Sequence, residues 1–305
     1  MTPYWDKARH QDRRGFLAAR ANIARAVRAW FWDQGFTEAE PAALVPSPGA
    51  ETHIDAFDAD GRYLHTSPEF AMKKLLAASE ENIFFLGKVW RRGETGPLHA
   101  EEFTMLEWYR AGAPYQAVME DCVALARLAA REAGAETLRW KKNACDPFAA
   151  PERLRVADAF ARAGAGDPAA LDGDAFSAAI VGIEPDLGAP ALTLLTEYPI
   201  AEAALARPCP HDARAAERFE LYACGVELAN GFGELTDADE QRARLIAAMD
   251  EKQKRYGVRW PLDEDFLVAL AHMPPASGCA LGFDRLVMLA TGARHINDVL
   301  WTPNA

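Results

Sequence analysis

The sequence predicts an α+β domain in which helices flank an antiparallel β-sheet. Two pairs of strand patterns are each joined by a short connection: 83–91 with 103–110, and 216–224 with 226–235. Short connections join antiparallel strands, whereas parallel neighbours need a crossover of a dozen or more residues. The sequence also lacks G-x-G-x-x-G and G-x-x-x-x-G-K-[ST], the glycine patterns of Rossmann and P-loop nucleotide sites.

The remaining elements follow from hydrophobic spacing and from helix signals. Residues 15–34 carry apolar side chains at helical spacing, and Gly35 is placed to end that helix. A short helix is expected from Thr66 to about Ser79, and a longer amphipathic one over 115–133.

The second half of the chain begins with weak signals. The segment 135–190 is rich in Pro, Gly, Ala and Asp, and we expect it to be a peripheral insertion. A strand at about 192–198 follows it. A helix over 237–256 is expected to be capped by Thr236, and a strand-to-helix passage covers 279–291. We expect residues 1–305 to form a single catalytic domain.

Charge and cysteine content narrow the function classes. The 305 residues carry a net charge of −12, which disfavours non-specific binding to nucleic acid or anionic membranes, because both need clustered basic side chains. The five cysteines are odd in number and contain no C-x-x-C, which indicates reduced thiols. The N-terminus lacks the apolar core of a signal peptide, and no apolar run approaches the roughly 20 residues of a membrane span. We therefore expect a cytoplasmic protein.

One strand pattern places a carboxylate among large side chains. In 103–110, alternation puts Phe103, Met105, Glu107 and Tyr109 on one face. That face could be exposed, or Glu107 could pair with a structural arginine. The functional interpretation is a carboxylate in an aromatic-walled pocket that awaits a cation.

The hairpin 216–235 gathers polar residues. A tight turn at Cys224-Gly225 would bring Glu220 nearly opposite Glu227, and like charges across a ladder need compensation, such as a divalent cation. A register shift of one residue would instead separate the two. Asn230 and Glu234 share the other face of the strand, so one common site requires a bulge near Asn230-Gly231.

Three basic residues are candidate phosphate ligands. Arg91 ends a strand ahead of a loop that contains His99, and Arg285 begins a helix, where a bound anion would offset its unfavourable place in the helix dipole. Each could equally be an ordinary surface residue. Glu69, in the first turn of its helix, is unremarkable alone.

Together these segments resemble the catalytic core of class II aminoacyl-tRNA synthetases, in the lysine, aspartate and asparagine branch. The resemblance covers residues 15–301 and is weakest over 135–190. It rests on five segments: 35–41, 66–69, 90–109, 227–235 and 278–285. Within this branch, the chain is similar to the lysyl-tRNA synthetase paralogues that modify elongation factor P, because the core starts almost at Met1 without room for an anticodon-binding domain. Ala229 and Ala280, at positions where the synthetases have Gly or another residue, also match these paralogues.

The resemblance implies a role for each matched residue. ATP would be bound by six residues, of which Arg91 and Arg285 would be catalytic: Arg91, Glu94, His99, Phe103, Asn230 and Arg285. Glu220 and Glu227 would hold Mg²⁺. The amino acid would be bound by Glu69, Glu107, Tyr109 and Glu234, with Ala229 shaping the pocket floor towards β-lysine.

The implied activity is adenylation of a lysine-like amino acid, expected to be (R)-β-lysine, followed by transfer to a lysine ε-amine of elongation factor P. A homodimer is implied through residues 35–41, and tRNA is not expected as a partner. One departure concerns ATP: Gly93 stands where the family has Glu, and Glu94 comes one residue late. Two alternatives stay open, namely a freestanding lysyl-tRNA synthetase-like core with another acceptor, and a non-catalytic regulatory paralogue.

Overall fold

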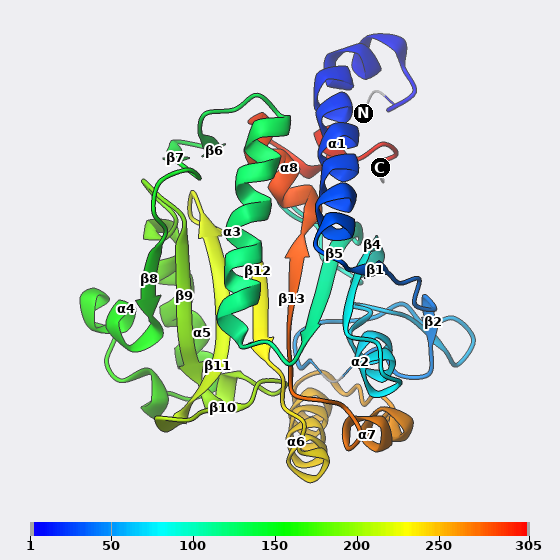
Figure 1. The fold of residues 1–305 in the computed structure, drawn as a ribbon, viewed down its shortest axis with the longest axis vertical. Coiled ribbons are helices and arrows are strands. Elements are labelled where there is room, and N and C mark those ends of the chain that lie inside the picture. The colour runs from blue at the N-terminus through cyan, green and yellow to red at the C-terminus, as the bar shows by residue number, and fades with distance from the viewer. Residues whose placement is uncertain (1–2, 50, 304–305) are drawn as a thin grey trace.

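The computed structural model describes residues 3–49 and 51–303. One large sheet organises this part of the chain (Figure 1), and it is built from β1 (Thr37–Glu38), β4 (Asn82–Trp90), β5 (Glu102–Ala111), β8 (Glu152–Arg155), β9 (Thr193–Pro199), β10 (Pro208–Cys209), β11 (Asp212–Ala223), β12 (Val226–Gly233) and β13 (Ala276–Gly282). The strand order is β1-β4-β5-β13-β12-β11-β9-β8, and β10 pairs with β11. Among the described strands, the outer pairs β1–β4 and β8–β9 are parallel and the central pairs are antiparallel. The predicted fold class is confirmed.

Helices α1 (Lys7–Asp33), α3 (Tyr115–Glu132) and α8 (Phe283–Thr291), with the short α9 (Ile296–Val299), cover one face of the sheet (Figure 1). The apolar stripe of α1 buries Ile23, Val27 and Phe31, and the Phe31 ring stacks on Phe84 of β4 with centroids 4.6 Å apart. This helix begins at Lys7 rather than at residue 15, because the Asp6 side chain accepts hydrogen bonds from its first free backbone N–H groups.

A second helical group packs on the other side of the sheet. It comprises α2 (Glu69–Ala77), α6 (Ala238–Tyr256) and α7 (Glu264–Leu270), whose buried side chains form a common core with β4 and β5. Helix α6 is capped by Asp237, whose side chain accepts from Asp239 N and Glu240 N, so the prediction of Thr236 as the cap was wrong by one residue. Helix α7 was not predicted.

The segment 135–190 lies at the β9 edge of the sheet (Figure 1). It contains β6 (Leu138–Trp140), β7 (Asn143–Cys145), α4 (Val156–Ala163), α5 (Gly173–Ile183) and two 3₁₀ turns, η1 (Pro168–Ala170) and η2 (Glu184–Asp186). A third turn, η3 (Ile200–Glu202), follows β9, and β2 (Leu44–Val45) pairs with β3 (Tyr63–Leu64) elsewhere. Phe160 and Phe176 stack in a small core shared with Tyr198. The segment thus adds the edge strand β8 to the main sheet.

The β11–β12 hairpin turns at the predicted place. Its two-residue loop is Cys224-Gly225, and both residues have positive φ, +58° and +74°. Positive φ at both positions defines the type I′ turn, whose twist matches that of paired strands. Among the described helices, none is both long and apolar enough to cross a membrane.

Candidate active site

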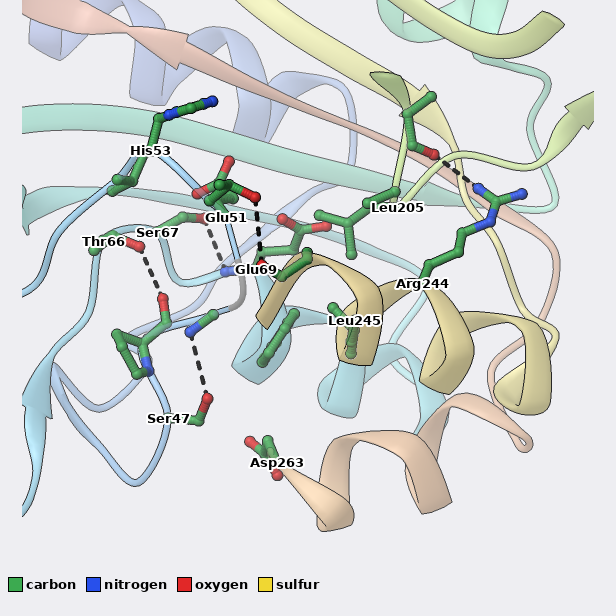
Figure 2. A pocket seen from close by; sticks show the side chains of 18 of the residues that line it. Ser47, Glu51, His53, Thr66, Ser67, Glu69, Leu205, Arg244, Leu245 and Asp263 are labelled. Atoms are coloured by element: carbon green, nitrogen blue, oxygen red, sulfur yellow. Dashed lines mark hydrogen bonds between the residues drawn. The ribbon is translucent and has the colours of Figure 1, made fainter. Parts of the chain in front are cut away.

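Two adjoining cavities lie beside the start of α2. The smaller has a volume of about 370 Å³ and is bounded by the β4–β5 connection, β12 and α8. The larger, of about 1030 Å³, extends between residues 42–49 and 51–54, α5 and α6. Ser67, Glu69 and Asn230 border both. Figure 2 shows the larger cavity, with Ser67 and Glu69 at the start of α2 and Arg244 and Leu245 on α6.

The structure brings together all six residues that the resemblance assigned to ATP. They line the smaller cavity: Arg91, Glu94, His99, Phe103, Asn230 and Arg285. They come from distant parts of the sequence and meet because β5 pairs with β13, which in turn pairs with β12. The antiparallel sheet therefore assembles one polar wall from the segments 90–109, 227–235 and 278–285.

Arg285 is held in a fixed direction at the beginning of α8. Its Nη1 donates to the Glu227 backbone oxygen at 3.0 Å, and its Nη2 lies 2.6 Å from His99 Nε2. A guanidinium has donors only, so His99 Nε2 accepts and the ring proton is on Nδ1. Burial and then Arg285 lower the pKa of His99. A neutral His99 therefore orients a permanently charged Arg285 in the cavity wall.

Arg91 lines the same cavity. Its guanidinium carbon is 5.3 Å from the centroid of the Phe103 ring, and its Nη1 is 3.9 Å from Glu94 Oε1. Gly93 has φ +80°, a left-handed conformation that glycine adopts readily. The chain turns there, and the Glu94 side chain reaches the cavity although it comes one residue later than in the family motif.

The predicted pairing of Glu220 with Glu227 is wrong in register. Glu220 is opposite Asn230, and Glu227 is opposite Tyr222. The pairing shifts between Leu221 and Tyr222, where Leu228 is the extra residue. A bulge is therefore present, as one common site required, but it lies ahead of Asn230-Gly231. Because one extra residue reverses the alternation, Glu227 and Asn230 both face the smaller cavity.

Glu220 is anchored on several sides. Its Oε2 accepts from Tyr198 Oη at 2.5 Å and from Tyr222 Oη at 2.6 Å, and its Oε1 accepts from Arg218 Nη2 at 2.5 Å. Arg218 borders both cavities and was missed in the sequence. Its alternation with Glu220 along β11, which puts both side chains on one face, was the available signal.

The donors at this wall are compatible with a magnesium ion. Glu220 and Glu227 offer hard carboxylate oxygens, and Asn230 Oδ1 is buried without a hydrogen-bond partner in the described residues. Desolvation and then Glu220 raise the pKa of Glu227 to about 7, a conflict that a bound cation would relieve. The described residues contain no cluster of three or more His, Cys, Asp or Glu side chains that could hold a metal. Phosphate oxygens and water would complete the coordination.

The side chains assigned to the amino acid lie behind the cavity wall. Glu107, Tyr109 and Glu234 are almost fully buried. Tyr109 Oη donates to Glu107 Oε1 at 2.8 Å, and Ser67 Oγ donates to Glu107 Oε2 at 2.6 Å. Ser67 borders both cavities, so its side chain links Glu107 to the cavity wall. Of the four residues, only Glu69 itself borders a cavity.

Burial leaves these carboxyl groups easily protonated. It raises the pKa of Glu107 to about 8, with Glu69 as the next contributor. It also raises the pKa of Glu234 to about 7, although Lys73 acts in the opposite direction. An ammonium group would favour the ionised forms. The cluster is therefore suited to a cationic ligand.

Lys73 is the residue that the sequence analysis missed at this place. Its Nζ donates to Glu69 Oε1 at 2.5 Å and lies 2.6 Å from Glu234 Oε2, and its side chain is fully buried. Burial alone would lower the pKa of Lys73, but Glu234 and Glu69 raise it above its ordinary value. The spacing of Glu69 and Lys73, four residues apart on a helix, indicates that the two can pair but not that the pair is buried.

Ala229 does not lie where the resemblance implied. Its side chain is buried in the core formed with α1, α3 and α8 and borders neither cavity. After the bulge at Leu228, Ala229 lies on the face of the sheet that α1, α3 and α8 cover, while its neighbour Asn230 faces the site. Ala280, opposite both Asn230 and Glu107, borders the smaller cavity. The methyl group near the site is that of Ala280.

Comparison with known proteins gives two results. A family model described as tRNA synthetases class II (D, K and N) matches residues 2–305. The chain is also 37% identical to an elongation factor P–(R)-β-lysine ligase from Pectobacterium carotovorum over 304 residues, 93% of each chain. Ligases of the same name from Vibrio cholerae (37%, 94% of each chain) and Pseudoalteromonas translucida (38%, 93% and 94%) are similar over comparable lengths.

Proposed function

The chain belongs to the class II tRNA synthetases of the D, K and N group, and we propose that it is an ATP-dependent ligase that attaches (R)-β-lysine to elongation factor P. Relatives of that name, similar over 93% or more of both chains, support the substrate and the acceptor. The observation that carries the proposal is the meeting of an Arg-lined cavity with a buried acidic cluster at Ser67 and Glu69. One region suits a triphosphate and the other suits ammonium groups.

The first step is adenylation. A carboxylate oxygen of the amino acid attacks the α-phosphorus of ATP, and the bond to pyrophosphate breaks. Arg91 and Arg285, which both line the smaller cavity, stabilise the negative charge that develops on the phosphates. Glu69, Glu107 and Glu234 orient the ammonium groups, so that positioning and electrostatics replace a covalent protein nucleophile.

The second step transfers the acyl group. The ε-amine of a lysine on elongation factor P attacks the acyl carbon, an amide bond forms, AMP leaves and the amine loses a proton. Magnesium, held by Glu220 and Glu227 with Asn230 nearby, would neutralise phosphate charge during adenylation. A homodimer through residues 35–41 is part of the proposal, and the exposed Trp32 and Leu44 next to this segment support a partner surface.

Amino-acid-dependent exchange of pyrophosphate into ATP tests the proposal. We expect exchange with (R)-β-lysine above that with α-lysine, and none with ornithine, asparagine or aspartate. Transfer of the labelled amino acid should then occur to elongation factor P and not to tRNA. Preference for α-lysine with transfer to tRNA would favour a synthetase core, and silence with every amino acid would reject an adenylating enzyme.

A further inference from the structure

Three carboxylates and one lysine share the buried end of the candidate site. Glu69 and Glu234 each contact Lys73 Nζ through one oxygen, and Glu107 accepts from Ser67 and Tyr109. Lys73 and Glu234 side chains are both fully buried, which makes an unpaired charge on either one costly. Lys73 is therefore part of the charge balance of the pocket, not a surface residue that reaches inwards.

The number of charges in the pocket indicates a role for Lys73. When a bound ligand ammonium keeps all three carboxylates ionised, they and the Lys73 ammonium together carry a charge of −2. A diamino acid brings two ammonium groups, so the filled pocket is neutral on the side of these groups. Without Lys73 the pocket would carry −3, and an ordinary diamino acid would leave one buried carboxylate without a partner.

The contacts of Lys73 leave one oxygen each of Glu69 and Glu234 available to a ligand. Lys73 Nζ donates to Glu69 Oε1 and forms an ion pair with Glu234 Oε2 at 2.6 Å. Neither oxygen of Glu234 has a hydrogen-bond partner in the described residues, and Oε1 has no ion-pair contact either. A Cβ built at Gly278 would lie 2.6 Å from this Oε1, so the absence of a side chain at Gly278 leaves the oxygen its space. Lys73 thus holds the two carboxylates together through one oxygen each and leaves the others for a ligand.

We propose that Lys73 is a positioning and specificity residue: a built-in counter-ion that sets the pocket charge to match an amino acid with two ammonium groups. This inference rests on the proposed ligase function and adds a residue that the family resemblance did not assign. It separates the role of Lys73 from that of Lys74 on the same helix, whose Nζ pairs instead with Asp263 and Asp265.

The first test is Lys73→Met, which keeps the length and apolar stem of the side chain and removes its charge. In pyrophosphate exchange with the full chain, KM for the diamino acid should rise about tenfold or more, while KM for ATP stays within about twofold. Lys74→Met is the matched control and should leave the KM for the amino acid unchanged. An unchanged amino-acid KM in Lys73→Met would overturn the inference.

A second comparison separates charge matching from a purely structural role. Glu69→Gln leaves the pocket at −1, and adding Lys73→Met returns it to −2 with Glu234 free. We therefore expect Lys73→Met to weaken amino-acid binding in the wild-type background and to improve it, about threefold or more, in the Glu69→Gln background. A structural role predicts weaker binding in both.

The outcomes remain decisive if a variant does not fold. Should Lys73→Met alone be unfolded, Glu69→Gln is compared with the double variant, in which Glu234 alone, rather than Glu234 and Glu69 together, faces the missing ammonium. An unfolded double variant would assign Lys73 to the fold alone and overturn the inference. Silence of the wild-type chain with every amino acid would reject the proposed function together with the inference, whereas an active wild type with additive variants would reject the inference only.

Discussion

Ser67 Oγ donates a 2.6 Å hydrogen bond to Glu107 Oε2, and this contact joins the open cavities to a carboxyl group that is almost fully buried. Ser67 precedes α2, and Glu107 lies in the middle of β5. The pKa of Glu107 rises to about 8 in this environment, first because of burial and then because of Glu69. The ionised form of Glu107 is therefore unfavourable in this environment, and a nearby ligand ammonium would stabilise it.

Glu107→Gln should raise stability and remove activity. In the folded protein the Glu107 pKa is about 8 rather than its ordinary 4.5, so folding takes up a proton between these values and the wild-type free energy of unfolding falls as pH rises through that window. Gln cannot ionise, so the variant should gain in Tm relative to wild type at pH 9 and much less at pH 5. Thermal melts at both pH values measure this. Equal differences at the two pH values would contradict the raised pKa.

The same variant should activate the diamino acid poorly. Removal of a carboxylate that pairs with a buried ammonium costs about 3–5 kcal/mol, or more than 10²-fold in affinity. Pyrophosphate exchange measures this loss. Full activity would place the ligand's ammonium groups elsewhere.

Gly278→Ala should disrupt the same cluster from the opposite strand. A Cβ there would overlap the Tyr109 ring and lie 2.6 Å from Glu234 Oε1, and neither group can move freely in the core. We expect loss of amino-acid activation with a rise in KM and lower thermal stability, typically by about 1–3 kcal/mol for overpacking. Gly182→Ala is the control, because a Cβ at that helical position meets open space and should be neutral or stabilising. An active, stable Gly278→Ala would show that this approach is not tight.

The sequence predicted the parts of the fold that depend on local pattern. The strands at Asn82–Trp90 and Glu102–Ala111 and the helix at Tyr115–Glu132 match their predictions within a residue or two at each end. Hydrophobic periodicity and glycine stops suffice for such elements. Helix α7 has only Glu264–Leu270, which is too short for the period to be distinctive.

The site residues also differ in how far local sequence pattern predicts them. Arg91, His99 and Arg285 could be predicted together because each belongs to a recognisable motif segment. Lys73 could not, because a lysine at i+4 from a glutamate normally forms an exposed helix pair, and its burial depends on Glu234 from a distant strand. The position of the bulge at Leu228 likewise depends on the pairing of β11 with β12, which spacing alone leaves open.

The two alanines of the family comparison can now be tested against each other. Ala280→Gly removes the methyl group that borders the smaller cavity, and we expect the preference for β-lysine over α-lysine to change about tenfold or more. Ala229→Gly makes the same change on the opposite face, in the core with α1, α3 and α8. It should therefore lower stability by about 1 kcal/mol and leave the preference unaltered. Pyrophosphate exchange with both isomers gives the ratio. A change in this preference caused by Ala229→Gly but not by Ala280→Gly would mean that Ala229, rather than Ala280, shapes the amino-acid pocket.

Arg285→Lys should impair ATP use more than His99→Ala does. The guanidinium of Arg285 contacts the Glu227 backbone and His99 through different nitrogens, a geometry that one ammonium cannot reproduce. Loss of His99 removes one orienting acceptor and leaves the charge in place. We expect KM for ATP to rise about tenfold or more in Arg285→Lys and only a few fold in His99→Ala, with the amino-acid KM unchanged in both. Arg294→Lys, at an exposed position after α8, is the control. An effect of His99→Ala equal to or larger than that of Arg285→Lys would contradict this expectation. It would mean that His99, rather than Arg285, makes most of the contact with the phosphates.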